Sequence, residues 1–125
     1  MITNQEIYDL AVAAGTKAGN EHNPTPMVVG RAKHLFGNEI VPGTEEVVEE
    51  GVCGFAWVNI KPATSSFARW CKTNVDGVHK SYYGGIDIWC RLFNQSMERK
   101  EAWADAFCEV LNEHGIRAYA MSRMD

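Results

Sequence analysis

Long hydrophobic runs are missing from the 125-residue sequence. No stretch approaches the roughly 18 continuous apolar residues that a membrane-spanning helix needs. The N-terminus lacks a basic start, and Glu6 and Asp9 interrupt its apolar part, so we expect no secretory signal. With 46% hydrophobic and 22% charged residues, the composition excludes general disorder, collagen-like repeats and coiled coils. The sequence therefore predicts a cytoplasmic globular protein that does not bind membranes, with one domain and an appendage.

Close cysteine pairs and familiar catalytic motifs are absent as well. Cys53, Cys71, Cys90 and Cys108 are separated by 18, 19 and 18 residues, so no CxxC pair pre-assembles two zinc ligands. Without a signal peptide we expect no disulfide framework, and we interpret the four thiols as reduced and mostly buried. The sequence has no Gly-rich phosphate loop, GxSxG or HExxH, and its four histidines are dispersed. We therefore expect no metal, no cofactor and no enzymatic activity.

Basic charge is scarce in the first part of the chain. The formal net charge is −4. Residues 1–50 carry three basic and eight acidic side chains, whereas residues 51–125 carry nine basic and eight acidic ones. This balance excludes a strongly basic nucleic-acid-binding surface over the whole chain and leaves only a local basic patch.

Residues 1–50 are predicted to form a helical N-terminal segment with an acidic linker. Thr3 and Glu6 form a capping box, apolar residues follow at helical spacing, and Gly19 with Asn20 ends the stripe. A proline-containing loop follows. The rest of this segment is ambiguous and is compatible with a short strand at 27–29, a helical turn at 31–36 and a solvated acidic run at 44–50.

Residues 51–125 have the pattern of a second, larger unit. Its elements alternate in the order β-α-β-β-α-β, which is the ferredoxin-like arrangement of an antiparallel sheet with two helices on one face. The first and third of these strands are expected at the centre of the sheet. We expect strands at 52–61, 78–83, 86–93 and 116–121, helices at 65–74 and from Asn94 or Ser96 to about His114, and a two-residue turn at Gly84-Gly85.

The alternation of side chains along each strand predicts which residues lie on the face that the helices leave open. That face is expected to carry Phe55, Trp57, Asn59 and Lys61 from the first strand, Trp89, Arg91 and Phe93 from the third, and Arg117, Tyr119, Met121 and Arg123 from the last. Asp87 is the only acidic residue expected there. Aromatic rings stack on bases and cations balance phosphate, so this face is a candidate binding surface. Alternatively, the N-terminal helix covers it and turns it into a second core.

Two smaller features have both a functional and a structural interpretation. The start of the last helix carries Gln95, Ser96 and Arg99, and free backbone N–H groups at such a position attract anions. These residues either form a site for a phosphate or carboxylate group or only cap the helix. Tyr82 and Tyr83 precede the double glycine and are either recognition residues or packing of an edge strand. The run after the glycines lacks the aromatic spacing of an RNA-recognition motif.

Three stretches resemble a group of small, uncharacterised proteins of tailed bacteriophages: GVCGFAWVNIKPATSSFARW (51–70), SYYGGIDIW (81–89) and NQSMERKEAWADAFCEVLNEHGIRAYAMSRMD (94–125). The resemblance implies a protein made in the cytosol of an infected bacterium. Small phage proteins of this kind are often accessory factors, and some inhibit host defences such as CRISPR nucleases or nucleotide-signalling systems. The resemblance brings no catalytic residue.

Two main hypotheses about function follow, and an enzyme that acts on a small anion at the helix start near Ser96 ranks third. The first is a non-enzymatic phage accessory factor that inhibits a host defence protein or nucleoprotein complex, in the manner of an anti-CRISPR protein. The second is a protein that binds single-stranded nucleic acid or a nucleotide second messenger through the aromatic and basic sheet face. A homodimer formed through the sheet is compatible with both hypotheses.

Overall fold

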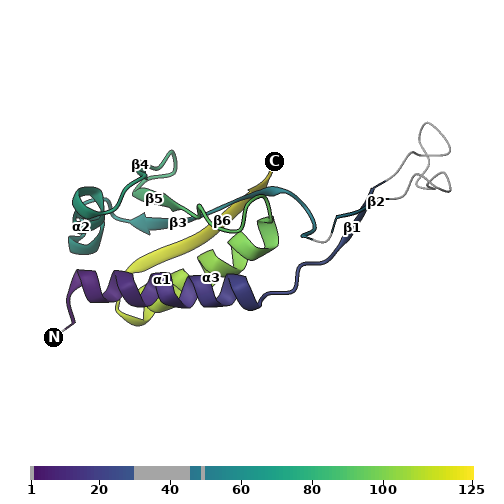
Figure 1. The fold of residues 1–125 in the computed structure, drawn as a ribbon. Helices are drawn as coiled ribbons and strands as arrows, with labels where there is room; N and C mark the ends of the chain where they lie inside the picture. The colour runs from purple at the N-terminus through teal and green to yellow at the C-terminus, as the bar shows by residue number, and fades with distance from the viewer. Residues whose placement is uncertain (1, 30–45, 49) are drawn as a thin grey trace.

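A computed structural model describes residues 2–29, 46–48 and 50–125 of the chain (Figure 1). The helices are α1 (Asn4–Glu21), α2 (Ser66–Asn74) and α3 (Met97–Glu113). The strands are β1 (Met27–Val29), β2 (Glu46–Val48), β3 (Gly54–Lys61), β4 (Val78–Lys80), β5 (Ile86–Trp89) and β6 (Arg117–Met124). The predicted short strand at 27–29 is present as β1, and part of the acidic run forms β2. The helical turn predicted at 31–36 lies outside the described residues.

The helices begin at the hydroxyl residues that the sequence predicts. The side chains of Thr3, Ser65 and Ser96 each accept a hydrogen bond from the backbone N–H three residues further on. Helix α3 ends before Gly115, whose φ of +76° suits a glycine. These signals are local, so they need no information about the rest of the fold.

Four strands form one antiparallel sheet in the order β4-β5-β3-β6. Strands β3 and β5 therefore lie at its centre. The chain is an α+β protein with an antiparallel sheet, as the sequence predicts. Strands β1 and β2 pair only with each other and form a separate ribbon that projects from the main body (Figure 1).

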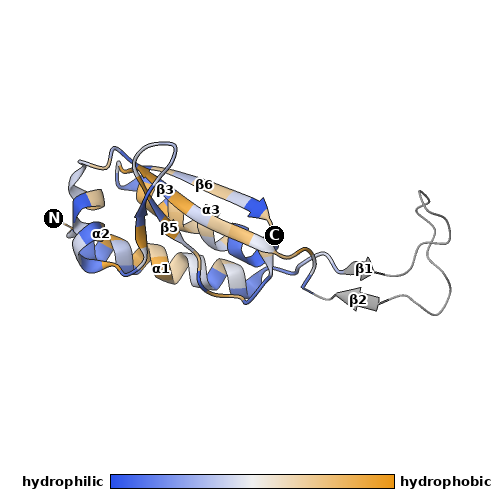
Figure 2. Cartoon of the chain, turned by 90° about the horizontal axis from the view of Figure 1, so that it is seen from above, coloured by the Kyte–Doolittle hydropathy of each residue, from blue (hydrophilic) through white to orange (hydrophobic). Residues whose placement is uncertain are grey.

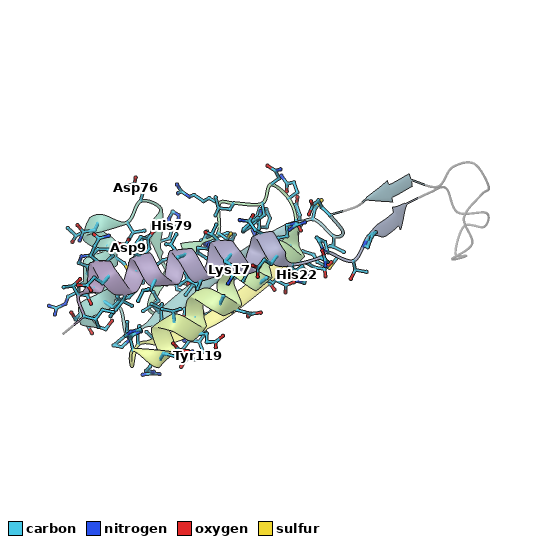
Figure 3. All side chains as sticks on the ribbon, turned by 60° about the horizontal axis from the view of Figure 1, so that its bottom comes forward. Asp9, Lys17, His22, Asp76, His79 and Tyr119 are labelled. Atoms are coloured by element: carbon cyan, nitrogen blue, oxygen red, sulfur yellow. The ribbon has the colours of Figure 1, made fainter. Side chains whose placement is uncertain are left out.

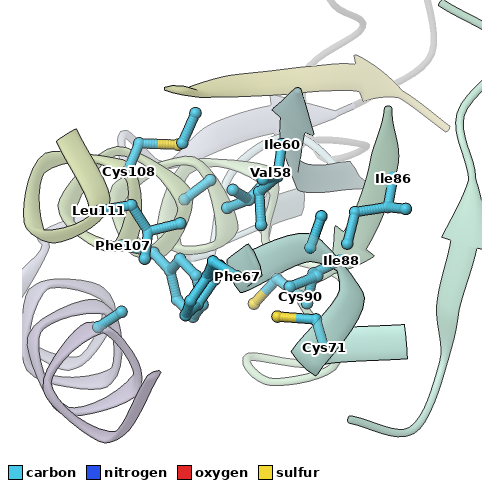
Figure 4. Packing of buried hydrophobic residues seen from close by; sticks show 14 of the residues in the cluster. Val58, Ile60, Phe67, Cys71, Ile86, Ile88, Cys90, Phe107, Cys108 and Leu111 are labelled. Atoms are coloured by element: carbon cyan, nitrogen blue, oxygen red, sulfur yellow. The ribbon is translucent and has the colours of Figure 1, made fainter. Parts of the chain in front are cut away.

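One hydrophobic core lies between this sheet and the helices (Figure 4). The even-numbered residues of β3 and β5 face it, as the alternation predicts, and α2 and α3 supply Phe67 and Phe107. If the predicted strand continued to Phe93, the same alternation would place Leu92 on the core side, but Leu92 is exposed because β5 ends at Trp89. The buried set includes Val58, Ile60, Ile86, Ile88, Cys71, Cys108 and Leu111.

Helix α1 packs beside α3 and shares the same core (Figures 1 and 3). Its buried positions Ala11, Gly15 and Gly19 recur every fourth residue and allow a close approach. A Cβ atom on Gly15 would lie 2.8 Å from Trp103 Cδ1, and one on Gly19 would collide with the ring of Phe93. Because α1 lies on the helical side, it does not cover the opposite face of the sheet (Figure 2). The division of the chain at residue 50 stays a prediction.

The hairpin between β4 and β5 differs from the predicted one. Instead of a two-residue turn between long strands, residues 81–85 form a loop, which Ser81 closes by donating its backbone N–H to Gly85 O at 3.0 Å. Both glycines have positive φ, as predicted. The expected strand at 86–93 stops at Trp89, and its predicted last residue, Phe93, has a positive φ that is incompatible with a strand. In contrast, β6 runs past the predicted end to Met124, because it pairs with the whole of β3.

Candidate aromatic groove on the open face of the sheet

The register of the sheet places most of the predicted surface residues on one face. Trp57 lies opposite both Trp89 and Met121, and directly opposite residues in an antiparallel pair share a face. The remaining cross-strand pairs on this face are Phe55 with Arg123, Asn59 with Asp87 and Tyr119, and Lys61 with Arg117.

The aromatic residues of this face form a packed cluster. The rings of Trp57 and Trp89 stack with centroids 4.6 Å apart and an angle of 16° between their planes. Phe55 meets Trp89 edge-on at 5.7 Å. The Arg123 guanidinium lies 5.4 Å from the Phe55 ring and 5.9 Å from the Trp89 ring, within cation–π range. Trp57 is 9% exposed, and its indole N–H has no acceptor in the described part of the chain.

Asn59 holds the loop 81–85 over the sheet. Its side chain is buried, and Nδ2 donates to Gly84 O and to Asp87 Oδ1, both at 2.9 Å. A Cβ atom on Gly85 would collide with Ile60 O, so the loop approaches β3 closely. Asn59 is therefore covered by this loop and orients both the loop and the Asp87 carboxylate.

The loop and the aromatic cluster enclose a groove of about 600 Å³, within the usual size range of small-ligand pockets. Tyr82 and Tyr83 form one wall and are 94% and 63% exposed. The other lining residues are Trp57, Asp87, Trp89, Ala120, Met121, Ser122 and Arg123.

Several groove residues were not in the predicted site, although the sequence contained a signal for some of them. Two tyrosines directly before two glycines indicate aromatic side chains at the tip of a tight turn, where they are exposed. The packing interpretation of this pair assumed that β4 continues through Tyr83. Because β4 ends at Lys80, both tyrosines lie on the loop instead.

Seven residues predicted on this face do not line the groove. Phe55 packs edge-on against Trp89, Asn59 is covered by the loop 81–85, and Phe93 packs against Gly19 of α1. The other four lie apart from the aromatic cluster. Lys61, Arg117 and Tyr119 form a neighbouring patch, in which Lys61 Nζ lies 5.7 Å from the Tyr119 ring centroid. Arg91 follows the end of β5 and points elsewhere. Its guanidinium lies beside Gly77 in the turn between α2 and β4, where a Cβ atom on Gly77 would collide with it.

The predicted anion-site residues Gln95, Ser96 and Arg99 line a separate cavity of about 360 Å³. Arg99 donates to Glu50 Oε2 at 2.6 Å and also to the backbone oxygens of Gly19 and Asn20 at the end of α1. The Ser96 hydroxyl donates to Glu50 O at 3.1 Å. An anion entering this cavity would compete with the Glu50 carboxylate for the guanidinium.

The three buried cysteines have raised pKa values, which is the opposite of nucleophilic activation. Burial raises the pKa of Cys71 and of Cys108 to about 12, and it also raises the pKa of Cys90. All four thiols are free, and Cys53 is exposed. Among the described residues there is no group of three His, Cys, Asp or Glu side chains arranged to hold a metal ion. No described helix has both the length and the apolarity needed to cross a bilayer.

The structure is that of an α+β protein with an aromatic groove on the open face of an antiparallel sheet. Comparison of the chain with protein-family models, with curated protein sequences and with solved structures found no match. The functional argument therefore depends on the chemistry of the groove itself.

Proposed function

We propose that this chain is a non-enzymatic binding protein whose groove holds a base of single-stranded nucleic acid or of a nucleotide. The observation that carries this proposal is that two exposed tyrosines, Tyr82 and Tyr83, line the same groove as the stacked pair of Trp57 and Trp89. Base–aromatic stacking contributes about 1–3 kcal/mol per base. A flat ring that enters the groove gains this contact without distorting the sheet.

The polar groups of the groove suit the two other parts of a nucleotide. Asp87 is the acidic lining residue, and Asn59 orients its carboxylate, which accepts hydrogen bonds from amino groups on a base edge. Arg123 lines the same groove and supplies a cation for phosphate. Cytosine and guanine offer amino donors to Asp87, whereas uracil does not, so uridine nucleotides are expected to bind more weakly.

The topology supports the same function. We infer that the four-stranded sheet is ferredoxin-like, since β3 and β5 are central and α2 and α3 contribute to one core. RNA-recognition modules of this topology stack bases on aromatic residues of the open sheet face. The inhibitory phage role stays a prediction, because no feature of the groove favours a particular host target.

The proposal is tested by titrating the full chain with a fluorescein-labelled ten-nucleotide single strand and with cyclic and linear mononucleotides. Binding is followed by fluorescence anisotropy and by tryptophan emission. We expect Tyr82→Ala and Asp87→Asn each to weaken binding about tenfold, and Arg123→Ala to reduce its salt dependence. Tyr119→Ala is the matched control, because Tyr119 is also an exposed tyrosine on this face but lies outside the groove.

Two results would overturn the proposal. One is the absence of binding for every probe at millimolar concentration. The other is an equal loss of affinity in Tyr82→Ala and Tyr119→Ala, which would mean that binding does not occur in the groove.

A further inference from the structure

The outer edge of β6 presents unpaired backbone groups. Asp125, just after β6, donates its N–H to Cys53 O at 3.1 Å. In an antiparallel ladder every second residue bonds to the same neighbouring strand, so the backbone groups of the odd-numbered residues of β6 face β3. The even-numbered Ala120, Ser122 and Met124 then turn their N–H and C=O groups outward. The outward N–H of Ala118 is accepted by Asn112 Oδ1 at 3.2 Å, which fits this assignment. Within the described residues, no strand pairs along this edge.

An acidic stripe runs along α3 beside this edge. Glu101, Asp105, Glu109 and Glu113 recur at every fourth residue and so share one helix face. Like charges at this spacing destabilise a helix. Burial raises the pKa of Asp105, and the negative charge of Glu101, whose carboxylate accepts a hydrogen bond from the Ser122 hydroxyl at 2.7 Å, raises it further.

The stripe and the edge enclose a second groove of about 720 Å³ between α3 and β6. Its floor contains Cys108, Ala118 and Ala120, and Asp105, Glu109 and Glu113 supply its charge. A smaller adjoining cavity extends it to Glu101 and Ser122. Neither cavity is lined by a lysine or an arginine. Figure 3 shows that α1 does not cover this side of the molecule, near Tyr119.

We propose that the outer edge of β6 takes up an extended, lysine- or arginine-containing segment of a partner protein as a fifth strand, with basic side chains over the acidic stripe. Strand addition uses main-chain hydrogen bonds for affinity and alternate side chains for selectivity. Charge decides the occupant, because pairing β6 with β6 of a second copy would bring two acidic stripes together. The inference does not rest on the nucleotide proposal, since it uses the edge of the sheet and its helical side, and the two grooves share only β6 residues such as Ala120.

The test uses a fluorescein-labelled ten-residue peptide of alternating lysine and valine and the full chain. A glutamate–valine peptide tests charge, and a lysine–valine peptide that is N-methylated at alternate residues tests main-chain pairing. We expect the lysine peptide to bind, the glutamate peptide to show no binding, and N-methylation to weaken binding at least tenfold. The double variant Asp105→Asn with Glu109→Gln should weaken binding about tenfold, whereas Asp9→Asn, an exposed acid of α1, should leave it unchanged.

Three outcomes would overturn the proposal. Equal binding of the N-methylated peptide would show attraction to the stripe without strand addition, and a failure of the lysine peptide to bind would exclude the site. A concentration-dependent dimer in sedimentation experiments, disrupted by Ser122→Pro, would assign the edge to a second copy. Ser122 is suited to this test because its N–H points away from β3, so a proline there leaves the ladder with β3 unbroken.

Discussion

A single buried amide controls the geometry of the aromatic groove. Asn59 is 1% exposed and bonds both the loop 81–85 and the Asp87 carboxylate. In the Asn59→Ala variant these two acceptors lose their donor, and we expect the free energy of unfolding to fall by about 1–3 kcal/mol. Urea denaturation measures this loss. Asn74→Ala removes an amide that makes one exposed local bond, so it should cost less than about 0.5 kcal/mol. Equal costs for the two variants would contradict the role given to Asn59.

At the level of residues, the alternation of side chains along each strand predicted more of the site than the predicted lengths of the strands did. Trp57, Trp89 and Arg123 share a face because side chains alternate, and this rule needs only a correct strand. The same alternation put Arg91 on this face, but β5 ends at Trp89, two residues before it. Asn59 was placed on the correct face, yet its burial depends on a loop whose path the sequence does not specify.

The packing of α1 against α3 depends on a small residue at their contact. Gly15 lies against Trp103 of α3, and a leucine there has no space without displacing α1. We expect Gly15→Leu to destabilise the protein by about 2 kcal/mol through overpacking, despite the higher helix propensity of leucine. Ala13→Leu, at an exposed position of the same helix, should change stability by less than about 0.5 kcal/mol. Thermal unfolding followed by circular dichroism compares them, and equal melting temperatures would contradict the packing of α1 on α3.

At the level of elements, the sequence predicted where the helices start, but it did not predict where strand β5 ends. A helix start depends on residues within one turn, so local capping residues predicted the three helices of the described residues, and the structure chooses Ser96 over Asn94 as the cap of α3. The end of β5 depends on a distant contact, because Phe93 leaves the sheet and packs against Gly19 of α1. No local pattern contains that information.

For the whole molecule, the structure separates two candidate surfaces that the sequence did not distinguish. The aromatic groove lies on the open face, and the acidic groove lies on the helical side of the β6 edge. Because α1 packs beside α3, neither surface is covered by it. The two grooves meet at β6, where Ala120 lines both, so the proposed nucleotide site and the proposed protein-segment site are neighbours. The chemistry of these surfaces indicates classes of ligand, whereas the phage origin and the host cytosol stay predictions.

The connection between the main body and the ribbon of β1 and β2 is expected to depend on pH. Glu98 of α3 holds the segment between α1 and β1, because its carboxylate accepts the Thr25 N–H at 2.8 Å and lies 3.3 Å from His22 Nε2. These hydrogen bonds, led by that of Thr25, lower the pKa of Glu98 below its ordinary 4.5. In acid the native state therefore binds fewer protons than the unfolded state. The stabilisation that ionised Glu98 contributes is complete above pH 4.5 and is lost as the pH falls through the lowered pKa of Glu98 in the native state.

We therefore expect hydrogen-exchange protection of the Thr25 amide, measured by NMR, to decrease on acidification below the ordinary glutamate range. Glu98→Gln should abolish this pH dependence, because an amide oxygen still accepts the Thr25 N–H but does not titrate in this range. Glu113→Gln, an exposed acid at the other end of α3, should leave the profile of the wild-type chain unchanged. If Thr25 lost protection equally in wild type and Glu98→Gln, the acid response would come from another group, and Glu98 would not be what attaches this segment to the main body.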